Sequence, residues 1–192
     1  MRTAIALLFI SFGLAFLLFV KINSDTLIKD FKFIGSERCK ACHVVDFRGN
    51  QYSKWKSSAH AESMKTLSGN KAKEYAKKNS IAEPLKNESC LKCHSTGFGL
   101  EIKYFETSFN LSEGIQCEEC HNRGSEYSKY QNMISRESFE SNGGDSGKLK
   151  NCYKCHSSNI NDKSLAVCPF QSKNFNAEES FKLIKHSIPN KK

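Results

Sequence analysis

Four short motifs in the sequence place two cysteines three residues apart with a histidine directly after the second. They read CKACH at Cys39–His43, CLKCH at Cys90–His94, CEECH at Cys117–His121 and CYKCH at Cys152–His156. This C-x-x-C-H spacing is the attachment signature of c-type haem. On one turn of helix the two thiols reach the two vinyl groups as thioethers, and the histidine points at the iron. The motifs therefore predict four covalently bound haem c groups.

Each motif supplies two haem-attaching cysteines and one axial histidine. The predicted attachment residues are Cys39, Cys42, Cys90, Cys93, Cys117, Cys120, Cys152 and Cys155, with His43, His94, His121 and His156 as iron ligands. The ninth cysteine, Cys168, precedes a proline and fits no motif. We interpret it as an unpaired thiol, with a haem ligand or an intermolecular disulfide as the alternatives.

Two other interpretations of paired cysteines are zinc binding and a disulfide framework. C-x-x-C pairs also build tetrahedral zinc sites, and exported chains with many cysteines are often held by disulfides. Histidine makes up only 6 of the 192 residues, so its presence directly after all four pairs by chance would be very rare. A disulfide framework also gives these histidines no role. We therefore expect haem, with no zinc.

The chain holds two further histidines, His60 and His186. Each lies on a predicted helix, and we predict that both are distal iron ligands. Met133 follows a glycine-containing turn after the third motif, and its thioether is the predicted third distal ligand. Four irons would need up to four such ligands, so at least one iron should lack a strong protein ligand.

The N-terminus carries an apolar run from Ala4 to Val20 behind a single basic residue, Arg2. This pattern is typical of an export signal. No small-x-small cleavage site follows, and the run reaches the lower limit of about 17 residues for a membrane-spanning helix. We predict an uncleaved signal-anchor over residues 1–21, a spacer over 22–32 and a tetrahaem domain over 33–189. The haem chemistry places this domain on the periplasmic side, anchored in the inner membrane by residues 4–20, and a removed signal is the alternative.

Composition and charge agree with a cofactor-filled interior. About 39% of the residues are hydrophobic, and many of these lie in the N-terminal run and the motifs. The remainder falls short of the usual ~45–50%, so flat apolar cofactors should complete the core. The net charge of +9 is partly offset by haem propionates, and the lysines are scattered without interleaved aromatic residues. We therefore expect no nucleic-acid partner.

The apolar spacing predicts mostly helix. One helix should span Tyr52 to Leu67 and carry His60, and a second, lysine-rich helix should span Asn70 to Asn79. Asn176 with Glu179 forms a capping box for a helix that runs to about His186. We therefore expect a mainly α fold with little β structure. It would be a compact multihaem cytochrome c domain of short helices packed around four haems, with an N-terminal membrane-anchor helix.

Two segments look less helical. Leu100, Ile102 and Tyr104 alternate with charged residues, which indicates a short strand pair or an extended flap. The stretch from Glu137 to Lys148 is rich in Ser, Asn and Gly and is predicted to be a mobile loop.

The segments FIGSERCKACH, YSKWKSSAHAESM, CLKCHSTGFG, EGIQCEECHNRGSEY and FKLIKHSIP resemble the tetrahaem cytochromes that accept electrons from hydroxylamine oxidoreductase, the "c-five-five-four" type. The resemblance covers roughly Phe33 to Pro189. It implies that His60 ligates the haem of the third motif and His186 that of the fourth. It also implies that the haem on His94 is five-coordinate.

The sequence departs from this family in two places. The family supplies the first haem with a histidine shortly after the third motif, whereas no histidine lies between His121 and His156 here. Met133 is the nearest substitute. The glycine-proline pair that usually follows the third motif is replaced by Asn122-Arg123.

Two functions are consistent with these features. The first is electron transfer between a redox protein donor and a redox protein acceptor, with no bond chemistry. The second is a redox enzyme that reduces a small nitrogen oxide, such as nitric oxide, at the five-coordinate haem on His94. No acid–base pair appears beside the second motif, which favours electron transfer.

Overall fold

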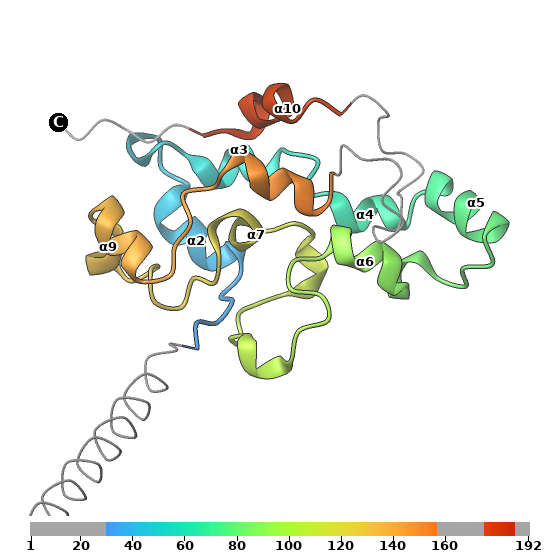
Figure 1. Cartoon of the computed structure of the whole chain (residues 1–192), viewed down its shortest axis with the longest axis horizontal. Coiled ribbons are helices and arrows are strands. Elements are labelled where there is room, and N and C mark those ends of the chain that lie inside the picture. Colours follow the sequence, from blue (N-terminus) through green and yellow to red (C-terminus); the bar gives the residue numbers. More distant parts are fainter. Residues whose placement is uncertain (1–29, 157–174, 187–192) are drawn as a thin grey trace, which may run out of the picture. The chain divides into compact units, whose positions relative to one another are not determined.

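Short helices make up most of the folded chain (Figure 1). A computed structural model describes residues 30–156 and 175–186. The α-helices in these ranges are α2 (Ser36–His43), α3 (Gln51–Lys56), α4 (Ser63–Leu67), α5 (Asn70–Lys78), α6 (Glu88–His94), α7 (Cys117–His121), α8 (Tyr130–Met133), α9 (Arg136–Ser141) and α10 (Ala177–Ile184). Five 3-10 turns lie between them in the same ranges, of which the longest, η6, spans Leu149–Lys154. Strand structure in the same ranges is limited to one isolated bridge between Phe33 and Phe105. The predicted mainly α class is confirmed.

Backbone contacts divide the chain into residues 1–30 and residues 31–192. The predicted anchor over residues 4–20 and the ninth cysteine, Cys168, lie outside the described residues. Among the helices of the described ranges, none is long and apolar enough to cross a membrane.

The predicted helix from Tyr52 to Leu67 is wrong, because it is interrupted between α3 and α4 by a series of turns over residues 57–62. The carbonyl of His60 accepts hydrogen bonds from the backbone of Ile115 at 3.0 Å and of Ser63 at 3.2 Å. The Ser63 hydroxyl accepts a second bond from Ile115 N–H at 3.0 Å. These long-range bonds replace helical ones, so His60 lies in a turn that is fixed to the segment before the third motif.

The two other predicted helices are confirmed, with small differences at their ends. Helix α5 begins after Gly69, which is its N-cap. Helix α10 begins after Asn176, whose side-chain oxygen accepts from the backbone N–H groups of Glu178 and Glu179, both at 3.1 Å. The helix ends at Ile184, so His186 lies just beyond it.

The two segments that looked less helical differ from expectation. The predicted strand pair around residues 100–104 is replaced by a 3-10 turn, η4 (Ile102–Tyr104), beside the bridge at Phe105. The predicted loop over 137–148 begins as helix α9, because Ser135 caps it by accepting from Ser138 N–H at 3.1 Å. In both cases local capping and turn bonds outweigh the strand or loop composition.

The interior near the motifs is unusually polar. Ser36 and Thr96 are fully buried, and Gln116 is 1% exposed. The Gln116 side chain accepts from Ser36 N–H at 2.9 Å and donates to the Asn110 carbonyl at 2.7 Å, while its backbone N–H donates to the Thr96 hydroxyl at 2.9 Å. Since these residues lie beside the first, second and third motifs, one buried polar network holds all three segments together.

We predict that Gln116→Ala lowers the free energy of unfolding by about 1–3 kcal/mol, because it leaves the buried Ser36 N–H without an acceptor. Gln131→Ala removes an exposed glutamine from α8 and should change stability by less than about 0.5 kcal/mol. Denaturant unfolding of the haem-loaded proteins measures both changes. Equal stability of the two variants would show that the network does not hold the motifs.

Candidate haem sites

Each predicted haem-attachment motif lies on its own short helical element. The first is on α2, the second on α6 and the third on α7, while the fourth is on η6 and the two residues after it. None of the eight motif cysteines, all of which lie in the described ranges, forms a disulfide. The structure therefore presents the four C-x-x-C-H groups in the helical form that the sequence predicts.

Three motif histidines are oriented through their Nδ1 atoms. The Nδ1 atom of His94 lies 2.6 Å from the Ser63 carbonyl oxygen, and that of His121 lies 2.7 Å from the Asp145 carbonyl oxygen. A carbonyl oxygen only accepts, so Nδ1 must carry the hydrogen and Nε2 keeps its lone pair. His43 Nδ1 lies 3.0 Å from the Gln51 amide oxygen, and the Gln51 nitrogen donates to the Arg48 carbonyl. Such outer contacts are typical of histidines that bind metals through Nε2.

The four motifs form two pairs that are not neighbours in the sequence. The nearby Cys117 thiol of the third motif is the main cause that raises the pKa of the Cys39 thiol of the first. The nearby Cys155 thiol of the fourth motif is the main cause that lowers the pKa of the Cys93 thiol of the second, to about 7. The first and third motifs therefore share one site, and the second and fourth share another.

A non-motif histidine faces one motif histidine in each pair. The ring centroids of His186 and His121 are 5.6 Å apart, and those of His60 and His156 are 6.1 Å apart. Two imidazoles that bind one iron from opposite sides need centroids roughly 6 Å apart, since each metal–nitrogen bond is about 2 Å. Both spacings therefore fit an iron between the rings.

The protonation of these distal histidines also suits metal binding. Burial, together with the nearby His121 and His43, lowers the pKa of His186 to about 4. Burial and then His156 lower the pKa of His60. Both imidazoles are therefore held neutral near pH 7, which is the form that donates a lone pair to iron.

Comparison with known proteins decides the family. The profile described as "Cytochrome c554 and c-prime" matches residues 38–122, which include the first three motifs. This chain belongs to the cytochrome c554 family. It is similar to cytochrome c-554 of Nitrosomonas europaea, with 32% identity over 131 residues, or 66% of this chain and 53% of that protein. The match thus spans about half of the relative's length. No solved structure matches the chain. For this c554-type chain the family implies covalently bound haem c.

The distal pairing in this c554-type chain differs from the one that the resemblance implied. His60 faces His156 of the fourth motif, and His186 faces His121 of the third. The reason lies in two long-range contacts. Ser63, three residues after His60, donates through its hydroxyl to the His94 carbonyl at 3.0 Å, which places the turn at the second and fourth motifs. Lys54 Nζ donates to the Lys185 carbonyl at 2.6 Å, which fixes the segment before His186 on α3.

This pairing uses both non-motif histidines of the chain. Each of them faces a histidine of the third or fourth motif. Met133 is the last residue of α8, and its side chain is 37% exposed. No ring or polar contact given for the described residues joins it to His43, so its role as a ligand stays a prediction.

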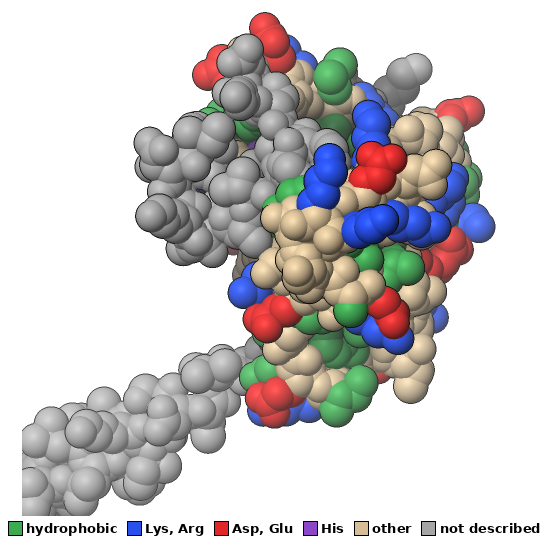
Figure 2. All heavy atoms as spheres, turned by 90° about the vertical axis from the view of Figure 1, so that its right-hand side faces the viewer, with side chains coloured by type: hydrophobic (Ala, Val, Ile, Leu, Met, Phe, Trp, Pro, Cys, Tyr) green, Lys and Arg blue, Asp and Glu red, His purple; other side chains and the backbone are tan. Residues whose placement is uncertain are grey.

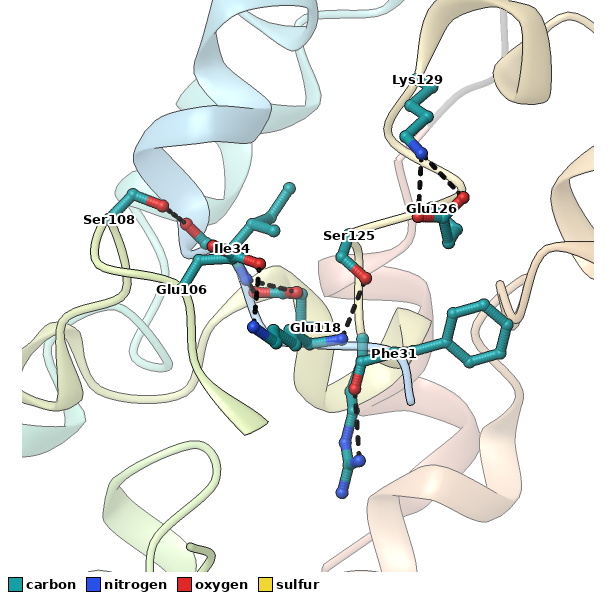
Figure 3. A network of polar contacts seen from close by, with 10 residues as sticks. Phe31, Ile34, Glu106, Ser108, Glu118, Ser125, Glu126 and Lys129 are labelled. Atoms are coloured by element: carbon teal, nitrogen blue, oxygen red, sulfur yellow. Dashed lines mark hydrogen bonds and ion pairs between the residues drawn. The ribbon is translucent and has the colours of Figure 1, made fainter. Parts of the chain in front are cut away.

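Glu118, in the middle of the third motif, is the main site residue that sequence reasoning missed. The residue is 2% exposed, and its carboxylate accepts from the backbone N–H of Ile34 at 2.9 Å (Figure 3). It also accepts from the backbone N–H groups of Gly35 at 2.8 Å and Gly124 at 2.7 Å. Burial raises the pKa of Glu118, while the hydrogen bonds from Gly35, Ile34 and Gly124 oppose the rise. This residue ties the backbone before the first motif to the loop after the third. A charged residue inside a haem motif is the only sequence signal for it.

The turn after the third motif forms without the usual glycine. Asn122 has φ 65° and ψ −177°, a region that favours glycine and costs other residues about 1–3 kcal/mol. Two contacts stabilise this strained conformation. The Tyr127 hydroxyl donates to the Asn122 carbonyl at 2.9 Å, and the Arg123 guanidinium carbon lies 4.1 Å from the centroid of the Tyr104 ring. The substitution by Asn122-Arg123 therefore keeps the turn.

Charged side chains of both signs mix on the face shown in Figure 2, where Lys and Arg are interspersed with Asp and Glu. Several lysines pair with an acid one helical turn away, including Lys65 with Glu62 at 2.7 Å and Lys86 with Glu83 at 2.9 Å. The charges of these lysines are thus balanced locally.

Gly114→Ala should displace His60, because an added Cβ would lie 2.5 Å from the Ser63 hydroxyl and 2.7 Å from the His60 carbonyl. We expect a loss of about 1–3 kcal/mol of stability and conversion of one haem from low to high spin in the absorption spectrum. Gly99→Ala is the matched control, since Gly99 also has positive φ but no atom within 4 Å of the added Cβ. Identical spectra for the two variants would contradict the placement of His60.

Proposed function

We propose that this chain is an exported, membrane-tethered tetrahaem cytochrome that passes electrons between two redox proteins. The observation that carries the proposal is the arrangement of the four motifs in two pairs, each with one distal imidazole opposite a motif histidine. Family membership supports haem c and electron transport. The apolar run over residues 4–20 supports the tether and the periplasmic location.

The residues that would hold four haems follow from this geometry. The eight motif cysteines provide the thioethers. The ligand pairs are His121 with His186 and His156 with His60, while His43 and His94 each bind one of the two remaining irons. Met133 is proposed as the second ligand of the iron on His43.

Haem c supplies a one-electron Fe(III)/Fe(II) couple and requires no bond chemistry from the protein. The chain would position the haems and set which of them are neighbours. The Ser63 and Asp145 carbonyls and the Gln51 amide hold the motif imidazoles. Gln116 and Glu118 hold the backbone before the first motif to the third, and Ser63 holds the turn of His60 to the second.

The two pairs are joined directly through the third and fourth motifs. Asn151, beside the fourth motif, donates through its side-chain nitrogen to the Cys120 carbonyl at 3.0 Å. Lys154 pairs with Glu119 at 3.7 Å. These bonds cross from α7 to η6, so electrons would have a protein-fixed path from one pair to the other.

Our first test of this proposal is the number of haems. The purified protein should retain four haems after extraction with acid acetone, because thioether bonds survive it and four complete motifs are present. Intact-mass analysis measures the count. Fewer than four covalent haems, or a stoichiometric zinc signal, would contradict the proposal.

Removing a distal histidine should open one haem. We expect His60→Ala and His186→Ala each to raise the number of carbon monoxide-binding haems by one over wild type, since each frees one iron. Carbon monoxide titration of the dithionite-reduced proteins, followed by absorption, measures the change. His60→Ala combined with His186→Ala should add two. No change in either single variant would exclude that histidine as a ligand.

A further inference from the structure

We propose that Glu118 is a positioning and charge-setting residue that lowers the reduction potentials of the haems held by the first and third motifs. This inference rests on the proposed function, because it requires haems at these motifs. It concerns the potentials of one pair and not whether the chain carries electrons.

The first support is the enclosure of the carboxylate. Both oxygens face backbone N–H groups, with Ile34 in contact with both at 2.9 and 3.1 Å, Gly35 with one and Gly124 with the other. Because every partner is a donor, this arrangement fits the ionised form, which only accepts. An added Cβ on Gly124 would lie 3.0 Å from the same carboxylate oxygen, so the enclosure is tight on this side.

The second support is the lack of a neutralising cation. The ion pairs of the described residues do not include Glu118, and none of the causes that shift its pKa is a basic side chain. Its neighbour Glu119 differs in both respects. Glu119 pairs with Lys154 at 3.7 Å, and its side chain is 26% exposed. The third motif therefore carries one buried, uncompensated charge and one partly solvated, compensated charge.

The third support is that the Glu118 carboxylate lies beside the first and third motifs. Glu118 directly follows Cys117 of the third motif. Its partner Gly35 donates to it at 2.8 Å and lies 3.7 Å, through its carbonyl oxygen, from the Cys39 sulfur of the first motif. Glu119 instead pairs with Lys154 of the fourth motif at 3.7 Å. A negative charge in a buried site favours the more positive oxidation state of a nearby iron. The haems on His43 and His121 should therefore be harder to reduce than they would be without Glu118.

This assignment gives the two pairs different roles. Reduction adds one electron to an iron and neither forms nor breaks a bond. By lowering the potentials of the first–third pair, Glu118 favours electron flow from this pair to the second–fourth pair. The same residue holds the backbone before the first motif against the loop after the third, so it fixes geometry and potential together.

The test is Glu118→Gln in the full-length, haem-loaded protein, with the haem count confirmed by mass. A redox titration followed by absorption should show two haems with a ferrous-to-ferric ratio about tenfold higher at a fixed ambient potential, or 59 mV for one electron, while the other two stay unchanged. Unchanged potentials in a four-haem protein would overturn the inference and leave the proposed function intact.

Three further variants separate charge from structure. Gln116→Ala weakens the same motif contact without removing a charge, so it should lower stability and leave the potentials of the first–third pair in place. Glu119→Gln removes the partly solvated, compensated charge of the same motif, so it should shift the potentials by less than Glu118→Gln. Glu118→Asp keeps the charge and should keep potentials near wild type at reduced stability, which also provides a test if Glu118→Gln fails to fold. An equal rise in potential in Glu118→Asp or Gln116→Ala would show that charge is not the cause.

Discussion

The fold depends on buried hydrogen bonds that hold the backbone beside the haem motifs in place. Only nine hydrophobic residues are buried in the described ranges, so side-chain packing alone gives little stability to short helices, which are marginal on their own. Buried polar side chains hold these backbone segments together instead. Gln116 and Glu118 hold the backbone of the first motif to the third, and Ser63 holds the turn of His60 to the second motif.

The same contacts explain how distant segments reach each other. The two distal histidines lie far apart in the sequence, and neither belongs to a regular helix. His60 lies in the turns between α3 and α4, where its carbonyl binds Ile115, and His186 follows the end of α10, which Lys54 holds from α3. Each imidazole therefore depends on one or two long-range hydrogen bonds for its position. A ligand held in this way can face a different motif from the one that sequence order suggests.

The sequence predicted the chemistry better than the geometry. The four motifs, the two distal histidines and the helical class could be read directly, because C-x-x-C-H spacing and helix caps such as Asn176 are local signals. The broken helix at residues 57–62 could not, since the bonds of His60 to Ile115 are non-local. The pairing of motifs was hidden for the same reason: it depends on contacts such as Cys39 with Cys117, which no periodicity encodes. Glu118 looked like an ordinary charged residue, and only its burial reveals its role.

The central claim is that each motif pair contains one iron bound by two histidines, in the order set by this fold. The most direct measurement is a crystal structure of the haem-loaded protein with the axial ligands resolved. The account predicts that His186 lies opposite His121 and that His60 lies opposite His156, with the first motif beside the third and the second beside the fourth. Ligation of the third haem by His60 and of the fourth by His186 would contradict it.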